Sequence, residues 1–150
     1  MTKRQAFDRM RRVRDELASA RFSLSHTLRV VNEDLGVLQA AGKDGTSPSE
    51  LARCRDNLQV NYILRLFSEF EAAVRDYWVS QVRNTRPNMS TLLDRVADRL
   101  DMTALVRVAA QDIRNFRNDI VHQNPRALTF DYSDCAKFLG NYLGFLPHTW

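Results

Sequence analysis

The sequence predicts an all-α fold, an antiparallel bundle of four to five helices that opens with a long N-terminal helix. Apolar residues recur at intervals of three and four positions through most of the chain, as on one face of a helix. The breaks between these stretches are short and rich in Gly, Pro, Ser, Asn and Asp. With 150 residues and 44% hydrophobic content, residues 1–150 suffice for one domain with a core of its own.

The first helix is expected over residues 6–38. Its apolar positions fall at intervals of three and four apart from one seven-residue step: Phe7, Met10, Val13, Leu17, Leu24, Leu28, Val31, Leu35 and Leu38. Cations oppose the helix dipole in the first turns, yet arginines gather there: Arg4, Arg9, Arg11, Arg12 and Arg14. Two interpretations of these arginines stay open, a solvated helix face and a patch that contacts phosphate.

A loop at residues 40–50, AAGKDGTSPSE, ends this helix, and Ser47 or Ser49 is expected to cap the next one. The second helix has a broad apolar face, which predicts that it is the most buried element. This face is rich in aromatic residues and comprises Leu58, Tyr62, Ile63, Leu66, Phe67, Phe70, Val74, Tyr77, Trp78 and Val82.

The second half of the chain predicts three further helices. TRPNMS, residues 85–90, is a break, and a short helix TLLDRVADRL follows it. The helix expected over 103–122 has its apolar stripe at Leu105, Val106, Ala109, Ile113, Phe116 and Ile120. It should stop before Pro125, because Asn124 is biased out of the helical region. After an irregular stretch, a helix around 133–145 directs toward the core Cys135, Phe138, Leu139, Tyr142, Leu143 and Leu146.

Composition limits the function classes. The net charge of +4 comes from 22 basic and 18 acidic residues, a mild balance that permits contact with phosphate without requiring it. Cys54 and Cys135 form no CxxC pair and have no neighbouring histidine, so we expect neither a zinc site nor a disulfide framework, and no metal or cofactor. The chain contains no apolar run long enough to span a membrane and no signal peptide, which favours the cytoplasm.

The stretch RNDIVH, residues 117–122, is the candidate site. On the 103–122 helix, Arg117 is expected on the flank of the apolar stripe. The opposite face should carry a polar row of Arg107, Gln111, Arg114, Asn118 and His122. Arg117 and His122 are five residues apart, or about 140° around an ideal helix, so the two side chains converge only if the arginine reaches around or the last turn distorts.

These residue types suit cleavage of RNA without a metal. A histidine can take the proton from a ribose 2′-OH or give one to the leaving 5′ oxygen. An arginine supplies fixed charge and paired donors to the phosphorane-like transition state, and an amide can orient either group. One histidine cannot act as base and acid at once, so the chemistry favours two copies across a dimer axis.

The same arginine-to-histidine spacing occurs in RFSLSH, residues 21–26, within the first helix. There Phe22 follows the arginine where RNDIVH has Asn118, and no helix end is near, so His26 is interpreted as structural or exposed. His148 has no arginine placed before it and is interpreted as part of the C-terminal tail.

On these residues the chain resembles the HEPN domains (higher eukaryotes and prokaryotes nucleotide-binding), small all-α bundles. Their motif is an arginine, usually followed by a polar residue, with a histidine four to six positions on; Arg117, Asn118 and His122 match it. The helix LRLFSEFEAAVRDYW is similar to the family's aromatic helix with a buried glutamate, here Glu71 or Glu69. The resemblance covers residues 51–146, and the long, basic first helix departs from the family's usual proportions.

The resemblance implies a metal-independent endoribonuclease, active as a homodimer in which two motif copies face each other in a cleft. Its products would carry a 2′,3′-cyclic phosphate and a 5′-hydroxyl. Members of the family often act as toxins beside a nucleotidyltransferase-type antitoxin, or in defence against phage. Arg117, Asn118 and His122 would be catalytic, with Glu71 and Arg114 supporting the site or binding RNA.

Other interpretations stay open. RNDIVH can be an ordinary helix end, at which a histidine favours the helix dipole and an asparagine caps locally. Glu71 can pair with Arg75 one turn on, and Arg114 can be solvated. The chain can also be a HEPN-like module without catalysis that dimerises and binds a partner protein or a nucleotide. A coiled-coil scaffold is disfavoured by the break at residues 40–50 and by the aromatic second helix.

Overall fold

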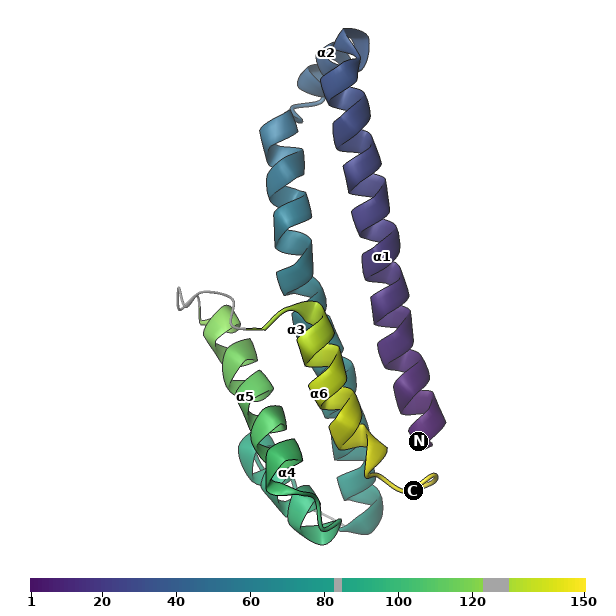
Figure 1. The fold of residues 1–150 in the computed structure, drawn as a ribbon, viewed down its shortest axis with the longest axis vertical. Helices are drawn as coiled ribbons and strands as arrows, with labels where there is room; N and C mark the ends of the chain where they lie inside the picture. Colours follow the sequence, from purple (N-terminus) through teal and green to yellow (C-terminus); the bar gives the residue numbers. More distant parts are fainter. Residues whose placement is uncertain (83–84, 123–129) are drawn as a thin grey trace.

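The computed structural model describes residues 1–82, 85–122 and 130–150, and within them the fold is all-α, as predicted. The described residues form six helices and no strand (Figure 1). Asn124 and Pro125, expected to end a helix, lie outside these ranges. No described helix is both long and apolar enough to cross a membrane.

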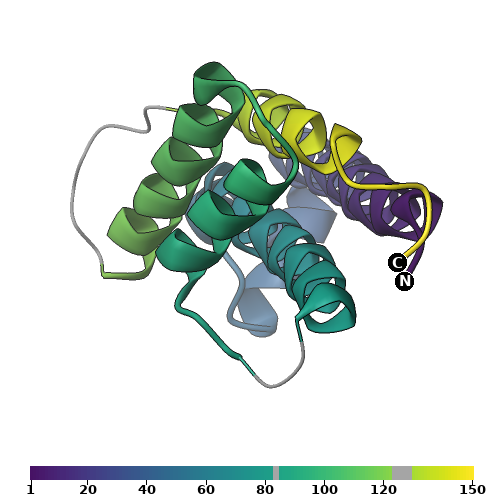
Figure 2. The same cartoon turned by 90° about the horizontal axis from the view of Figure 1, so that it is seen from below.

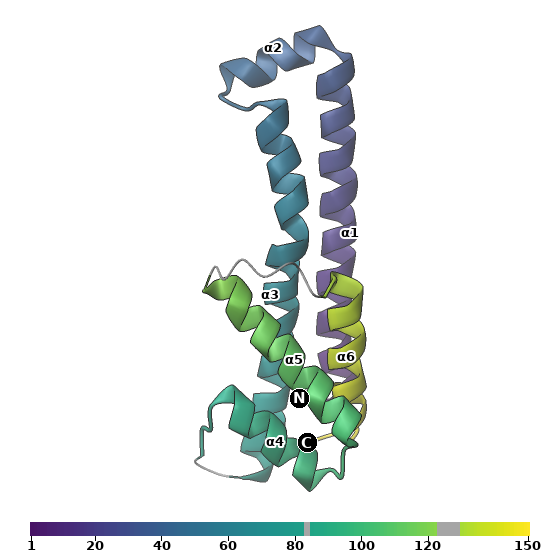
Figure 3. The same ribbon diagram turned by 60° about the vertical axis from the view of Figure 1, so that its left-hand side comes forward.

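Two long antiparallel helices form the frame of the molecule (Figures 1 and 3). The helix α1 spans Lys3–Glu33 and α3 spans Pro48–Gln81, which at 1.5 Å per residue makes them about 46 Å and about 51 Å long. The short helix α2, Leu35–Lys43, lies across their upper ends. We call residues 18–62, which extend beyond the remaining helices, the arm.

The predicted first helix is wrong at its C-terminal end. It stops at Glu33, because Asp34 adopts an extended backbone (φ −121°, ψ 110°) and caps α2. The Asp34 carboxylate accepts hydrogen bonds from the backbone N–H groups of Gly36 and Val37 at 2.8 and 3.2 Å. Residues 40–43, expected in a loop, therefore belong to α2.

The start of α3 follows the prediction. Of the two candidate caps, Ser47 is the N-cap; its hydroxyl accepts from the Glu50 N–H, and the Glu50 carboxylate accepts from the Ser47 N–H at 2.8 Å. This reciprocal pair satisfies two backbone donors that the helix itself cannot. Pro48 follows at the first helical position, where its missing N–H costs nothing.

Three shorter helices pack around the lower half of α3 (Figures 1 and 2). They are α4, Met89–Arg99; α5, Ala104–Val121; and α6, Tyr132–Gly144. α5 packs against α4, α6 and α3, and α6 also packs against α1. The predicted helices of the second half are thus present, with ends within two residues of the expected ones.

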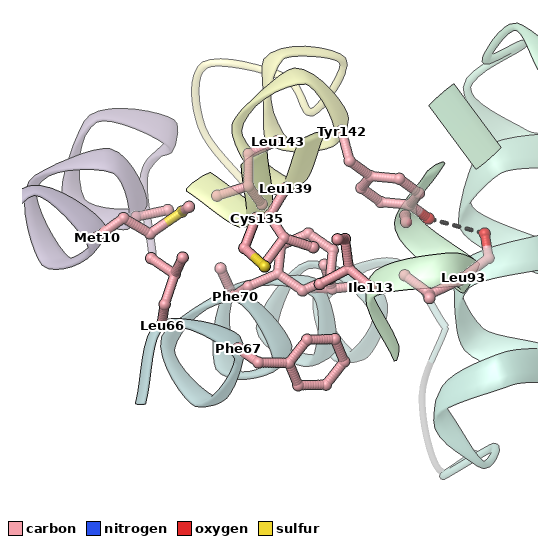
Figure 4. Close-up of a cluster of buried hydrophobic side chains, with 14 of the residues drawn as sticks. Met10, Leu66, Phe67, Phe70, Leu93, Ile113, Cys135, Leu139, Tyr142 and Leu143 are labelled. Atoms are coloured by element: carbon pink, nitrogen blue, oxygen red, sulfur yellow. Dashed lines mark hydrogen bonds between the residues drawn. The ribbon is translucent and has the colours of Figure 1, made fainter. Parts of the chain in front are cut away.

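The core lies between α1, α3, α4, α5 and α6 (Figure 4). As predicted, α3 contributes most to it, with eight buried residues: Ile63, Leu66, Phe67, Phe70, Ala73, Val74, Tyr77 and Trp78. The ring of Phe70 meets Tyr142 edge-on at 5.5 Å, and the Tyr142 hydroxyl donates to the Leu93 carbonyl at 2.7 Å. That hydrogen bond satisfies the polar atom of a side chain buried on every side.

The predicted apolar stripe of α5 is wrong at two positions. Leu105 is 80% exposed, and the fully buried alanine is Ala110, whereas Ala109 is half-buried. Val106 packs against the core, and Leu105 lies about 100° away from it around the helix. Leu105 and Val106 therefore cannot both face the core, and the spacing of apolar residues alone did not show which of the two does.

The arginines of α1 lie mainly in the solvent. Arg4 and Arg11 pair with Asp8 at 3.8 and 3.5 Å, and Arg14 pairs with Asp15 at 2.9 Å. Arg9 reaches Glu69 of α3 at 3.8 Å. These ion pairs are exposed and contribute little to stability. A solvated helix face therefore accounts for much of this arginine patch.

Candidate functional site

The RNDIVH stretch occupies the last turn of α5. The helix ends at Val121, and His122 is its C-cap, with its backbone N–H donating to the Asn118 carbonyl at 2.9 Å. Figure 3 shows this end of α5 beside the middle of α3, where the arm begins. The sequence thus predicted the position of these residues at a helix terminus.

Arg117 is fixed from two directions. Its guanidinium lies over the ring of Phe67 in α3, 5.9 Å from the ring centroid, and its Nη1 donates to Oδ1 of Asn118 at 3.1 Å. The side chain is half-buried. A cation over an aromatic face is attracted by the ring quadrupole, and burial strengthens the attraction. Arg117 therefore keeps a defined orientation on the flank of the core, as the helix geometry predicted.

The histidine is not brought to the arginine. The His122 side chain is exposed, and no hydrogen bond or ion pair from the described residues engages its imidazole. The structure therefore places Arg117 and Asn118 in contact, and within residues 1–82, 85–122 and 130–150 it shows no hydrogen bond from the His122 imidazole to either side chain. The five-residue separation, about 140° on an ideal helix, accounts for this arrangement.

The predicted polar row on α5 divides into two parts, because α4 covers its first half. Arg107 forms an ion pair with Asp98, and the Gln111 amide donates to the Ser90 carbonyl at 2.9 Å and to Asp94 at 3.0 Å. These side chains join α5 to α4. The second half of the row, Asn118 and His122, lies beyond α4.

Arg114 lies between the two halves. It is half-buried; its Nη2 donates to Oδ1 of Asn115 at 2.6 Å, and its Nε is buried without a hydrogen-bond partner within residues 1–82, 85–122 and 130–150. A buried donor without a partner costs free energy. Arg114 lies three residues before Arg117, on the same side of the helix end.

Glu71 pairs with Arg75, one turn on in α3. Nε and Nη2 of Arg75 both approach Oε1 of Glu71 at 2.7 Å, and Arg75 also donates from Nη1 to the Pro87 carbonyl at 3.2 Å. The other candidate, Glu69, faces Arg9 of α1. Glu71 lies one turn after Phe67, the ring that holds Arg117, so the two share a face of α3. Among the described residues, no hydrogen bond or ion pair links Glu71 to Arg117, Asn118 or His122.

Sequence reasoning missed the role of Phe67. It assigned this aromatic to the core, where 2% of its surface is exposed, and Figure 4 shows its ring at the edge of the labelled cluster. The Phe67 ring lies 5.7 Å from that of Phe70 in the core, and the Arg117 guanidinium lies over it at 5.9 Å. A pairing between helices far apart in sequence leaves no signal in either helix alone.

No group of three or more His, Cys, Asp or Glu side chains within the described ranges gathers closely enough to hold a metal ion. The residues assembled at the end of α5 are instead a fixed guanidinium, an amide and an exposed imidazole. Compared with protein-family models, with curated proteins and with solved structures, the chain matches none.

Proposed function

We propose that this protein is a metal-independent endoribonuclease that cleaves RNA by attack of a 2′-OH on the adjacent phosphate. The observation that carries the proposal is the position of Arg117, held by Phe67 and Asn118 in the last turns of α5, the helix that the exposed His122 caps. A fixed guanidinium stabilises charge that develops on a phosphate without reorganising during the reaction. An exposed imidazole is open to a polymeric substrate.

The reaction needs one proton acceptor and one proton donor. A neutral imidazole takes the proton from the 2′-OH, and the 2′ oxygen then attacks phosphorus. The bond from phosphorus to the 5′ oxygen breaks, and a protonated imidazole gives that oxygen its proton. The products are a 2′,3′-cyclic phosphate and a 5′-hydroxyl, and the electron and proton balance requires no oxidant or metal.

Each chain offers a single His122, so two copies of RNDIVH would supply acid and base. We therefore place the active site in a homodimer in which two α5 ends share a cleft, as the resemblance to HEPN domains implies. Asn118 would hold Arg117 in position, and the guanidinium of the half-buried Arg114 would contact a flanking phosphate. Glu71 would act indirectly, through the packing of α3. A toxin paired with a nucleotidyltransferase-type antitoxin, or a phage-defence effector, is the proposed biological setting.

The test is incubation of purified protein with total RNA and transfer RNA in EDTA. We expect the wild type to cut and to leave cyclic phosphate ends, and His122→Ala and Arg117→Ala to lose activity by roughly 100-fold or more. His26→Ala is the matched control, since His26 is also an exposed histidine five residues after an arginine, on α1. It should cut as the wild type does.

The alternative proposal is a HEPN-like module that binds a partner protein or a nucleotide without catalysis. It is favoured by the lack of contact between Arg117 and His122 within one chain. If no RNA is cut, or if His122→Ala and His26→Ala cut equally well, the ribonuclease proposal fails and this alternative takes its place.

A further inference from the structure

A small pocket opens between α1 and α6, on a different face from the end of α5. Its volume is about 220 Å³. Its apolar wall comes from three helices, with Phe7 and Met10 of α1 and Leu66 of α3 facing the first turns of α6. Met10 and Leu66 also border the core cluster in Figure 4. The pocket therefore has a rigid apolar floor.

The polar groups of this pocket are Tyr132 and two guanidinium groups. Tyr132, the first residue of α6, is 7% exposed, and its hydroxyl is buried with no hydrogen-bond partner in the described part of the chain. Arg11 and Arg14 of α1 line the same pocket. A buried hydroxyl without a partner is unfavourable, so a ligand whose binding turns this hydroxyl toward an acceptor in the pocket would stabilise the protein.

The ionisation of Tyr132 fits a donor role. Burial raises the pKa of the Tyr132 hydroxyl to about 12, although the Arg14 guanidinium lowers it in part. The hydroxyl therefore keeps its proton at neutral pH and donates. Asp15 raises this pKa in turn, and Arg14 and Tyr132 line the same pocket.

Arg11 and Arg14 are available to bind an anion, although each already pairs with a carboxylate. Arg11 lies 3.5 Å from Asp8, and Arg14 lies 2.9 Å from its neighbour Asp15. The side chains of Asp8 and Asp15 are 46% and 60% exposed. Ion pairs in such exposed positions contribute little, so either guanidinium can turn toward a bound anion.

We propose that the pocket between α1 and α6 binds a small organic anion, a carboxylate or phosphate group attached to an apolar body. The acidic group pairs with Arg14 and Arg11, and the Tyr132 ring shifts so that its buried hydroxyl donates to the same group. The apolar body packs against Phe7, Met10 and Leu66. The volume accommodates a group near the size of one ring and is smaller than the roughly 300–1,000 Å³ of pockets for drug-sized ligands. The proposal does not depend on ribonuclease activity.

The experiment is isothermal titration calorimetry with phenyl phosphate and with benzoate, compared with inorganic phosphate and with phenol. We expect at least one aryl anion to bind more tightly than both comparators, because they lack either the apolar body or the charge. A preference between the two anions identifies the acidic group. If neither binds more tightly than phenol and inorganic phosphate, the proposal is wrong.

Three variants place the binding in this pocket. Tyr132→Phe and Arg14→Gln should each weaken binding of the aryl anion by roughly tenfold or more, since each removes a hydrogen bond to a charged group. Arg12→Gln is the control, because this substitution removes the same charge from α1 at a different place. Arg12 lines a separate hollow with Glu16 and Arg65. Equal losses of affinity in Arg12→Gln and Arg14→Gln would mean that net charge alone accounts for the binding, and this would overturn the proposal.

The ligand-free protein gives a second readout. Tyr132→Phe removes an unpartnered polar atom and keeps the ring, so its melting temperature should equal or exceed that of the wild type. A clear decrease would mean that the hydroxyl already has a partner within the protein, which contradicts the proposal.

Discussion

Arg117 combines a structural contact with partial exposure to solvent. The contact with the Phe67 ring contributes about 0.5–2 kcal/mol, depending on how far water is excluded. That is small beside the total stability of a domain, so its main effect is to fix the guanidinium plane. A lysine would keep the charge but lose the planar pair of donors, and for that reason Arg117→Lys is not a conservative change.

Substitutions in the core should cost much more stability than substitutions at the candidate site. Phe70 is fully buried between the rings of Phe67 and Tyr142, at 5.7 and 5.5 Å, so Phe70→Ala should cost about 3–5 kcal/mol by leaving a cavity. His122→Ala, at an exposed site, should stay within about 0.5 kcal/mol of the wild type. Urea denaturation followed by circular dichroism measures both.

Two outcomes would contradict this separation. A cost for His122→Ala close to that of Phe70→Ala would make the histidine a structural cap. A cost below about 1 kcal/mol for Phe70→Ala would mean that neighbouring side chains collapse into the space. Val79→Ala, at a position 56% exposed on the same helix as Phe70, controls for loss of apolar side-chain atoms.

At the scale of the helices, capping residues determine where each element begins. Ser47→Ala removes the hydroxyl that accepts from the Glu50 N–H and should cost about 1 kcal/mol. Ser49, one of the two caps that the sequence left open, contacts only the Ser47 hydroxyl within the described residues, so Ser49→Ala should cost clearly less. Thermal unfolding of both variants checks the assignment, and an equal loss would contradict it.

The same cap predicts that the stabilisation by Ser47 depends on pH. Hydrogen bonds from the Ser47 backbone and hydroxyl lower the pKa of Glu50 below its ordinary value of 4.5. A carboxylate whose pKa is lower in the folded state stabilises the fold above the unfolded pKa and loses this effect as the pH falls through the folded pKa. The difference between wild type and Ser47→Ala should therefore shrink when unfolding is measured at acid pH.

The helices show what the sequence predicts well and what it does not. Periodicity located the long apolar faces, because each depends on spacing within one segment. It continued the first helix past Asp34, since Leu35 and Leu38 keep the same spacing on the far side of the break. It also could not show that α4 covers Arg107 and Gln111, because that depends on how two helices meet. The contact of Arg117 with Phe67 was missed for the same reason.

At the scale of the whole molecule, the arm and the end of α5 lie on one side of the body. α1 and α3 extend well beyond α5 and α6, and α5 ends where the arm begins (Figures 1 and 3). The arm buries only a small apolar set of its own, Leu28 and Val31, and leaves Phe22 and Leu35 about three-quarters exposed. RNA or a second chain that approached His122 would therefore meet the arm as well.

The proposed ribonuclease makes a kinetic prediction at this scale. Because each chain supplies one His122, cleavage needs two chains, and the rate per chain should rise with protein concentration until the dimer is saturated. Rates measured over a wide concentration range, with light scattering on the same samples, test this. Below saturation the total rate should follow the square of the concentration, and above it the first power. A rate strictly proportional to concentration in samples that scatter as monomers would show that one chain suffices, and the second proton-transfer group would then have to lie within it.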